Sequence, residues 1–433
     1  MNQTLFVEFV KKWFGALALR FTETINGKKT GPTYLFKDML KKVYSADLKW
    51  NSLSVESSIV AADVVAMDSP LPLKRRDVIK KADGDLPKIG MKLAKGEKLI
   101  SDINIMRARG ATEAQIVSKI FEDSPKCQSG IYERLEYCFL QALSTGITLV
   151  PDMDNVGVGI RVNYGYLDKN KFGAVVKWGE NGYTPLSDVT RVVAAASDEG
   201  GTISIVMLSK KAFNLMRNSD EGKQLSANFR GLVITDGKYP VPTPSQFNEA
   251  IKDEYGFEFR IVDRTIRIEK NGKQRPVKPF EEDTLVFLTT DQVGTLTYGT
   301  LAEETNPVAG VEYQKVDDYI LLSKYSKNDP LREFTSSQAL VLPVIENVEQ
   351  IYLLHTREAQ VVAETEIEGD ATVTVYDKKY TKTEVLAAMK AAGVKVAVNI
   401  SDAKLIAKIN ELSDDDEAKV KAEIEKLTPV TEA

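Results

Sequence analysis

The chain is poor in the residues on which most catalytic and metal centres depend. Its 433 residues include one histidine, His355, and two cysteines, Cys127 and Cys138. A single histidine excludes, within one chain, the metal sites that need two, and it disfavours a Ser-His-Asp triad. Two cysteines cannot build a disulfide framework, and we expect Cys138, at an apolar helix position, to be a buried thiol.

Two further absences narrow the function. The sequence has neither the GxGxxG loop of dinucleotide-binding proteins nor the GxxxxGK[ST] loop of nucleotide triphosphatases. It has no run of about 18 apolar residues, which a membrane-spanning helix requires. Glu8, Lys11 and Lys12 interrupt the apolar start, so no signal peptide is expected. We therefore expect no enzymatic activity, no cofactor, no bound metal and no membrane partner.

Charge is present in both signs but is unevenly distributed. Residues 357–433 carry 11 basic and 16 acidic side chains, which accounts for the net charge of −5, so residues 1–356 are neutral overall. Within that neutral part, residues 74–98 hold nine basic and four acidic groups. This pattern indicates that the basic stretch and the acidic tail face different neighbours, although solvated faces on one domain would also produce it.

Hydrophobic spacing predicts a fold of the α+β class. An apolar stripe at helical spacing runs through residues 1–21, and its members are Phe6, Val10, Trp13, Leu17 and Phe21. We expect this helix to dock on the protein's own core or on a neighbour's rather than on a membrane. A capping box at Thr112 and Gln115 begins one helix, and a longer one is expected over 129–145. Strands dominate from residue 147, with a hairpin at Asn271-Gly272.

The basic stretch and the acidic tail each coincide with a distinct segment of the chain. From residue 69 to about 100 the chain has three prolines and three glycines among its basic residues, which is typical of a projecting loop. Residues 357–433 contain a short strand, a helix boxed by Thr381 and Glu384, and two further capped helices. These helices supply apolar residues for a small core of their own, namely Leu386, Met389, Leu405, Ile406 and Ile409.

The most specific motif lies near residue 330. Residues 328–339 read NDPLREFTSSQA and precede the apolar strand 340–343. Pro330 restricts φ and Asp329 can accept a backbone N–H, so a turn is expected there. Residues 280–299 place a strand before a Gly-x-x-x-Tyr-Gly turn. In these segments and in their order, roughly residues 30–355 resemble the tailed-phage major capsid proteins of the lambda type (capsid protein E), whose fold is the Hong-Kong-ninety-seven type.

The resemblance implies an architecture for each part of the chain. The expected parts are an N-terminal arm (1–68), an extended loop (69–100), a peripheral domain with a long helix (101–201 and 311–356), an axial domain (202–310) and an appended helical module (357–433). The turn motif would belong to the peripheral domain, with Arg332 and Glu333 fixing the turn after Asp329 and Pro330 and Phe334 anchoring it.

The resemblance also implies a function and its partners. The chain would be a coat protein that assembles with itself, as hexamers and pentamers, into an icosahedral virion shell around double-stranded DNA, without sequence-specific contacts. Portal and head-completion proteins would be further partners, as would a scaffold or decoration protein, and assembly would take place in the host cytoplasm. The basic residues expected to contact an adjacent subunit are Lys74, Arg75, Arg76, Lys80 and Lys81. A nanocompartment shell of the same fold, or an unassigned soluble α/β protein, are the alternatives.

Overall fold

The computed structural model describes residues 3–27, 33–56, 78–150, 159–232, 239–270 and 272–359, together with 372–375, 378–392, 394 and isolated positions between 405 and 424. Helices and strands are both abundant, which confirms the predicted α+β class. The chain divides into two compact units, Met1–Gln360 and Val361–Ala433. This division lies close to residue 357, where the sequence places the start of the appended module.

One sheet of the first unit is organised by the long strand β16 (Arg332–Ile345). Its first half lies between β15 (Ile320–Lys327) and β4 (Lys88–Gly96), and its second half pairs with β13 (Gly294–Gly299). The sheet is completed by β14 (Glu312–Val316) beside β15 and by β1 (Leu40–Tyr44) in parallel with β13. Buried residues alternate along the first half of β16 and then run continuously from Val341 to Ile345, so only the second half is covered on both faces.

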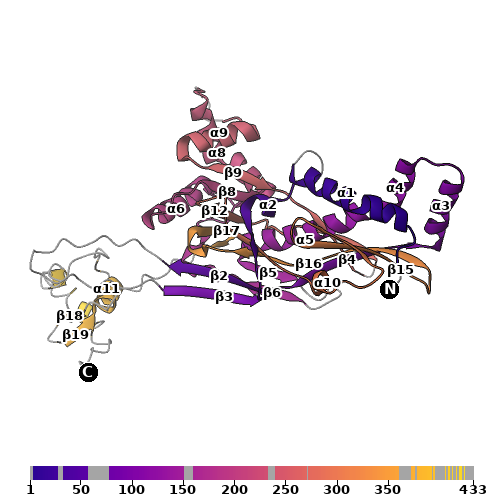
Figure 1. The fold of residues 1–433 in the computed structure, drawn as a ribbon. Coiled ribbons are helices and arrows are strands. Elements are labelled where there is room, and N and C mark those ends of the chain that lie inside the picture. Colours follow the sequence, from indigo (N-terminus) through magenta and orange to yellow (C-terminus); the bar gives the residue numbers. More distant parts are fainter. Residues whose placement is uncertain are drawn as a thin grey trace, which may run out of the picture. The chain divides into compact units, whose positions relative to one another are not determined.

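A layer of helices covers one face of this sheet (Figure 1). The long helix α5 (Ser124–Thr145) packs on β16 and β4, and it ends at Gly146, whose φ of +73° is the left-handed conformation that glycine adopts readily. Around it lie α1 (Val7–Asn26), α2 (Leu35–Met39), α3 (Glu97–Ala108) and α4 (Glu113–Phe121). The predicted capping box of Thr112 and Gln115 is confirmed at the start of α4.

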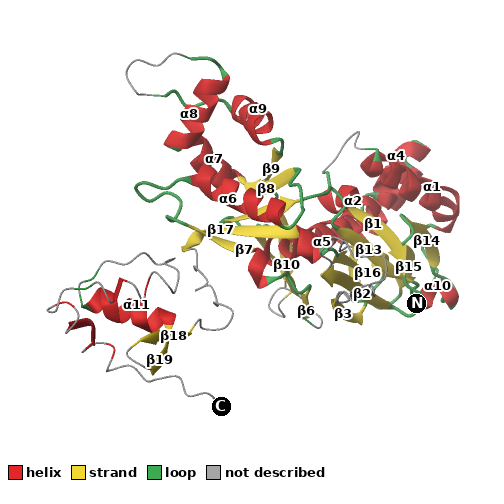
Figure 2. Ribbon diagram, turned by 90° about the vertical axis from the view of Figure 1, so that its left-hand side faces the viewer, coloured by secondary structure: helices red, strands yellow, loops and turns green. Residues whose placement is uncertain are grey.

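The second sheet of this unit has five strands in the order β7 (Lys171–Ala174), β17 (Ile351–Ala359), β12 (Thr284–Leu288), β8 (Ile205–Ser209) and β9 (Glu258–Val262). Its helices are α6 (Pro185–Asp198), α7 (Lys210–Asn218), α8 (Asp220–Phe229) and α9 (Pro244–Tyr255) (Figure 2). One face of this sheet packs with its helices in a core that contains the fully buried Trp178 and Phe247. Its other face contributes Met207, Val286 and Leu353 to the core that it shares with the first sheet. The second sheet is therefore buried on both faces.

Three two-stranded ribbons and a short helix complete the first unit. The ribbons are β2 (Lys49–Glu56) with β3 (Val78–Asp85), β5 (Ile147–Val150) with β6 (Ile160–Asn163), and β10 (Ile266–Lys270) with β11 (Lys273–Val277). The helix is α10 (Ala302–Thr305). The β10–β11 ribbon confirms the hairpin predicted from Asn271-Gly272, of which Gly272 lies within the described residues at φ +74°.

The second unit has a small core of its own. It contains β18 (Thr372–Val375), β19 (Lys378–Thr381) and α11 (Lys382–Ala391), and the described positions at 405, 408–409, 416, 419–421 and 424 are helical. Val385, Met389, Leu405 and Ile409 are buried together, as the sequence predicts, and Leu386 packs beside them. Ile406 lies outside the described residues.

Two features of the first unit differ from the sequence-based predictions. Residues 88–96, expected within the extended loop, form β4 and pair with β16 over nine residues, because alternate residues such as Ile89 face the core. On α1 the residues that face the core are Val10, Phe14 and Ala18, whereas Trp13 and Leu17 of the predicted stripe are only half-buried. The apolar arc of α1 is thus wider than the face that its own chain covers.

Candidate assembly surfaces

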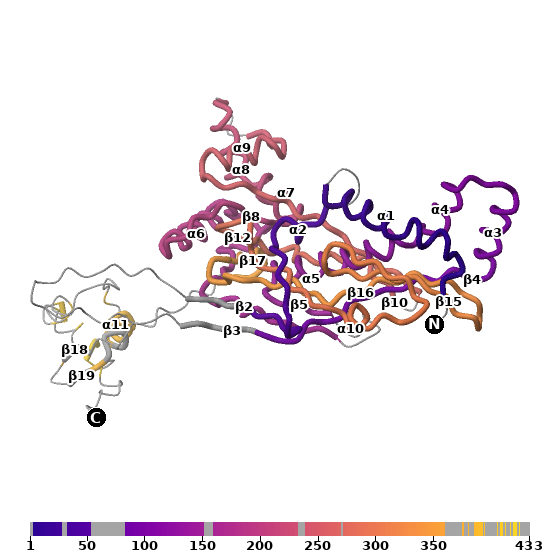
Figure 3. The backbone as a smooth tube through the Cα atoms, viewed as in Figure 1, coloured from indigo at the N-terminus to yellow at the C-terminus, as the bar shows by residue number. Residues whose placement is uncertain are grey.

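Two of the five basic residues predicted to contact a neighbour lie in the β2–β3 ribbon. Lys80 and Lys81 belong to β3, where they are in register with Ser54 and Leu53. Lys74, Arg75 and Arg76 lie outside the described residues, in the segment 57–77 that joins the two strands. The ribbon extends to the side of the unit away from α1 and α4 (Figure 3).

The turn motif forms the connection between β15 and β16, as predicted. The Asp329-Pro330 bond is cis, and Arg332 begins β16 with an exposed side chain. Phe334 is half-buried: its ring stacks on Tyr325 with centroids 5.2 Å apart, and the Lys92 Nζ lies 5.2 Å from its centroid. The ring therefore holds the β15–β16–β4 surface together without entering the core.

Replacing Phe334 by alanine should lower the free energy of unfolding by about 2 kcal/mol, because a half-buried ring loses less than the about 3–5 kcal/mol expected at a fully buried site. Phe36, which is fully buried, provides the matched comparison. Thermal melts of both variants would test this, and equal losses for Phe334→Ala and Phe36→Ala would contradict the half-buried placement.

Glu333 is directed away from the turn. Its side chain is fully buried, and its carboxylate accepts hydrogen bonds from the Thr4 hydroxyl and, at 3.0 Å, from the Leu5 backbone N–H. Ser326 adds a 2.6 Å hydrogen bond to the carbonyl of Gln3. The hydrogen bonds of Glu333 therefore hold the start of the chain against the β15–β16 hairpin, instead of fixing the turn.

A buried lysine faces this carboxylate. The Lys324 Nζ lies 3.8 Å from Glu333 Oε1 and donates to Thr335 Oγ1 at 3.1 Å, and its side chain has no exposed surface. Burial lowers the pKa of Lys324 to about 8, although Glu333 offsets part of this effect. Burial likewise raises the pKa of Glu333, against the opposing influence of Lys324 and Thr4. The two groups form a buried ion pair in which each charge depends on the other.

Two more carboxylates, those of Asp317 and Glu136, hold residues 35–42 of the N-terminal arm. Asp317 lies 2.7 Å from both Lys37 and Lys42. Burial disfavours its ionised form, but the two lysines outweigh that effect and leave its pKa below the ordinary value. Glu136 of α5 accepts hydrogen bonds of 3.1 Å from the N–H groups of Leu35 and Phe36. Together with Glu333, these groups attach residues 4–42 to the body at three points.

The Glu136 contact predicts a pH dependence. Burial raises the pKa of Glu136 to about 7, although the two N–H groups oppose it. A raised pKa means that its stabilising contribution is complete below the ordinary pKa of 4.5 and is lost as pH rises through 7. The wild-type protein should thus lose about 3 kcal/mol of stability between pH 5 and pH 8 from this group.

Replacing Glu136 by glutamine should remove that loss while keeping an oxygen acceptor for the α2 N–H groups. Guanidinium unfolding at pH 5 and pH 8 would measure the free energy of unfolding of both proteins. The two values should be similar at pH 5, and the value for E136Q should be the larger one at pH 8. If the difference in free energy of unfolding between wild type and E136Q is the same at pH 5 and at pH 8, Glu136 does not titrate in this range.

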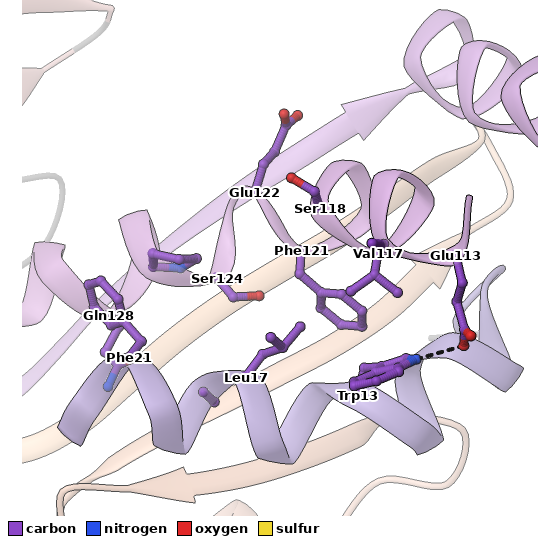
Figure 4. Close-up of a pocket in the computed structure, with 13 residues that line it drawn as sticks. Trp13, Leu17, Phe21, Glu113, Val117, Ser118, Phe121, Glu122, Ser124 and Gln128 are labelled. Carbon is purple, nitrogen blue, oxygen red and sulfur yellow. Dashed lines mark hydrogen bonds between the residues drawn. The ribbon is translucent and has the colours of Figure 1, made fainter. Parts of the chain in front are cut away.

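An apolar groove lies between α1 and α4, with a volume of about 630 Å³. The half-buried Trp13, Leu17 and Phe21 of α1 form one wall, and Val117 and Phe121 of α4 form the other (Figure 4). At one end, the Trp13 Nε1 donates to Glu113 at 2.9 Å. The part of the α1 stripe that the protein's own core leaves uncovered therefore faces an open groove.

No arrangement typical of a catalytic or metal centre is found in the part of the chain that the structure describes. Within those residues there is no group of three or more His, Cys, Asp or Glu side chains that could hold a metal ion. His355 lies on β17 with its Nδ1 3.1 Å from the Thr284 hydroxyl. Cys127 and Cys138 are both buried, and no helix among the described residues could cross a membrane.

Comparison with known proteins decides the assignment. Residues 21–354 match the family described as phage major capsid protein E. The chain belongs to this family. The matched region covers nearly all of the first unit, so the resemblance inferred from the 328–339 motif is confirmed. The assignment makes this chain a phage major capsid protein and favours that function over a nanocompartment shell.

Solved structures similar to this capsid protein include shells of several kinds. A protein described as the capsid protein of a prophage of Escherichia coli CFT073 has 13% identity over 82% of this chain and 99% of its own, with a TM-score of 0.48. The mature capsid of bacteriophage PhiM1 has 9% identity over 75% and 88%, with a TM-score of 0.40. An encapsulin from Synechococcus elongatus PCC 7942 has 10% identity over 75% and 86%, with a TM-score of 0.34. No curated protein matches the chain.

The buried groups that attach the arm of this capsid protein were not predicted from the sequence. Lys324 lies in β15, and a lysine among the apolar neighbours of a buried strand signals a buried partner. Glu333 was identified through its motif, but its partners Thr4 and Leu5 are more than 300 positions away. Pairings at that separation leave no mark in local sequence patterns.

Proposed function

We propose that the protein assembles, as pentamers and hexamers, into the icosahedral head shell that encloses the double-stranded DNA genome of a tailed phage. The observation that carries this proposal is the match of residues 21–354 to the phage major capsid protein E family. A structural role with no catalysis agrees with the apolar cores and the three attachment points of the arm. In a self-assembling protein, the functional site is the set of contacts that repeats between copies of the chain.

The parts of the chain have distinct roles in this proposal. Residues 1–68 form the arm. Of the residues expected in the extended loop (69–100), 78–85 form one strand of the β2–β3 ribbon, whereas 88–96 form β4 and belong to the sheet of β16. The helix α5 with β14, β15 and β16 belongs to the peripheral domain (101–201 and 311–356), and β8, β9 and β12 with α7, α8 and α9 belong to the axial domain (202–310). Lys74, Arg75, Arg76, Lys80 and Lys81 contact acidic groups of an adjacent subunit.

The DNA is held without sequence recognition. Residues 1–356 are neutral overall, so they lack the basic footprint of proteins that bind duplex DNA tightly. Portal, head-completion and scaffold or decoration proteins are the remaining partners, and assembly takes place in the host cytoplasm before the protein becomes part of the virion.

Electron microscopy of the purified full-length protein tests the proposal. We expect closed shells of uniform size, built from rings of five and six subunits, in the presence of a scaffold if one is required. A protein that stays monomeric at high concentration under all these conditions would contradict self-assembly. Protein cargo in place of DNA inside native particles would favour the nanocompartment alternative.

The second unit is proposed to be an appended module on the outer surface or at junctions between capsomers. Its own core and the division at Gln360–Val361 support this role. Its charge of −5 disfavours a position against packaged DNA, since like charges repel within a Debye length of about 8–10 Å.

Deleting residues 360–433 should therefore leave shell assembly intact, with at most a modest loss of thermal stability. Sedimentation and negative-stain microscopy of the truncated protein would measure the yield of shells. Complete loss of shells would show that the module takes part in assembly, and density for the module on the inner face would overturn its location.

A further inference from the structure

The β10–β11 ribbon carries a concentration of positive charge that the neutral total of residues 1–356 conceals. Residues 264–278 contain six basic side chains and one acidic side chain, so this segment has a net charge of +5 and the remainder of 1–356 has −5. The stretch 74–98 has the same net charge, but spread over 25 residues instead of 15. The ribbon is therefore a second basic segment of the chain, and a denser one.

Only the base of the ribbon uses its basic residues in ion pairs with the body. Arg264 lies 2.5 Å from Glu133 of α5, and Lys278 lies 2.7 Å from Glu282. Nearer the turn, the described basic side chains are exposed, and they are those of Arg267, Lys273 and Arg275. These three groups are accessible to another molecule.

A small apolar core fixes the position of the ribbon. Ile266 and Ile268 of β10 are buried against Tyr137 and Cys138 of α5 and against Val150 of β5. The ribbon is thus attached to the long helix through one strand. Its exposed groups are held on a supported element and do not sit on a free loop.

The register of the ribbon sets where its charges lie. Arg275 is opposite Ile268, and Lys273 is opposite Lys270 at the end next to the turn. Opposite residues of an antiparallel pair share a face and successive residues alternate, so Arg267 lies on the other face. Positive charge therefore lies on both faces of the ribbon.

The exposed surface of the ribbon suits phosphate groups better than a protein surface. The buried centre of a protein interface is apolar and rich in aromatic residues, and none of the large exposed apolar residues among the described ones lies within 264–278. This segment also has no aromatic residue on which the bases of a single strand could stack. The chemistry that remains is contact with the phosphates of a double-stranded nucleic acid, which carries no sequence information.

We propose that Arg267, Lys273 and Arg275 contact phosphates of the packaged double-stranded DNA, so that the β10–β11 ribbon lies on the inner wall of the shell. This inference rests on the proposed shell function and names the part of the chain that meets the genome. Three contacts hold DNA weakly on a single subunit, but a closed shell repeats them in every copy, and repeated weak contacts add up to firm attachment.

The salt dependence of DNA binding by the full-length, unassembled protein tests the contact. The probe is a fluorescent DNA duplex of about 30 base pairs, followed by anisotropy. Three phosphate contacts predict a slope of log K against log[salt] of about −2.7, which is a loss of affinity of about 40-fold between 50 and 200 mM salt. A duplex of unrelated sequence should bind equally well.

Neutralising the three groups together, as R267Q, K273Q and R275Q, should bring the slope close to zero and lower the affinity at low salt at least tenfold. The matched control is K98Q with K210Q and K327Q, which removes the same charge from three exposed lysines on separate elements and should bind DNA like the wild type. Circular dichroism and shell yield should be unchanged in both variants. Equal binding by the ribbon variant and the wild type would overturn the inference, as would a wild-type slope near zero.

Cysteine labelling of assembled shells tests the side on which the ribbon lies. Lys273→Cys adds an exposed thiol, whereas the native Cys127 and Cys138 are buried. In intact shells we expect labelling by a small, permeant maleimide but not by a maleimide on a polyethylene glycol chain too large to enter. After the shells are dissociated, both reagents should react.

Two other labelling results would overturn the inference and leave the proposed function intact. Reaction of intact shells with the large reagent would place the ribbon on the outer surface. Protection of intact shells from both reagents would place it in a contact between proteins. Failure of the wild-type protein to form shells would instead count against the proposed function.

Discussion

Replacing Lys324 by methionine should lower the free energy of unfolding by about 3–5 kcal/mol, one of the largest losses expected from a single change in this protein. The reason is the buried carboxylate of Glu333, which lies 3.8 Å from the ammonium group and would be left without a counter-charge. Methionine is similar in length and fits an apolar site, so lost packing contributes little.

The measurement can be confined to the unit that contains the pair. The three tryptophans, Trp13, Trp50 and Trp178, all belong to the first unit, so fluorescence during guanidinium unfolding follows that unit alone. Lys327→Met is the matched control, because Lys327 lies on the same strand with an exposed side chain. We expect it to change stability by no more than about 0.5 kcal/mol.

A double variant separates the charge effect from the effect of side-chain shape. Adding Glu333→Gln to Lys324→Met removes the unpaired charge and keeps an oxygen that can accept from Leu5. The double variant should recover most of the lost stability, since replacing both members of a buried pair is often nearly neutral. If the double variant is as unstable as Lys324→Met alone, the loss arises from packing and the ion-pair argument is wrong.

Reversing Arg75 and Arg76 to glutamate should abolish shell formation while leaving the far-ultraviolet circular dichroism of the unassembled protein unchanged. The change turns residues 74–98 from nine basic and four acidic groups into seven and six. Each exposed ion pair contributes only about 0–1 kcal/mol, but reversal replaces attraction by repulsion at every copy of the contact, and about 1.4 kcal/mol per contact is already a tenfold change in affinity.

Salt and a second reversal give the controls for this variant. At 1 M salt the Debye length falls to about 3 Å, so part of the assembly should return if the defect is electrostatic. Lys419→Glu with Lys421→Glu changes the net charge by the same amount within the appended module and should leave the shell yield unaffected. A wild-type yield of shells from the Arg75/Arg76 variant would show that these two residues make no contact that assembly needs.

The features that could be predicted from the sequence are those with local causes. The capping box at Thr112, the Asn271-Gly272 hairpin and the long helix α5 all depend on residues within a few positions of one another. The family resemblance depended on a continuous motif around Asp329. The small core of the second unit was predictable for the same reason, since its helices carry their own capping signals.

The features that were missed depend on which surfaces meet. The spacing on α1 showed an apolar helix, but each residue turns by about 100°, so an arc that includes both Trp13 and Phe14 does not reveal which half faces the core. Similarly, β4 has lysine at Lys88, Lys92 and Lys95, which favours a solvated loop until its pairing with β16 is known. The assembly residues 74–76 remain a prediction.

The pairing of β4 has a mechanical consequence. Only Leu86 and Pro87 separate β3 from β4, so a neighbour that pulls on the β2–β3 ribbon pulls on β4 along its length. In an antiparallel pair the hydrogen bonds run perpendicular to the strands, and tension along β4 therefore loads its nine paired positions with β16 together, in shear, instead of opening them one at a time. Tension applied to the ribbon by a neighbouring subunit is thus transferred through β4 to β16, the long strand that organises the six-stranded sheet.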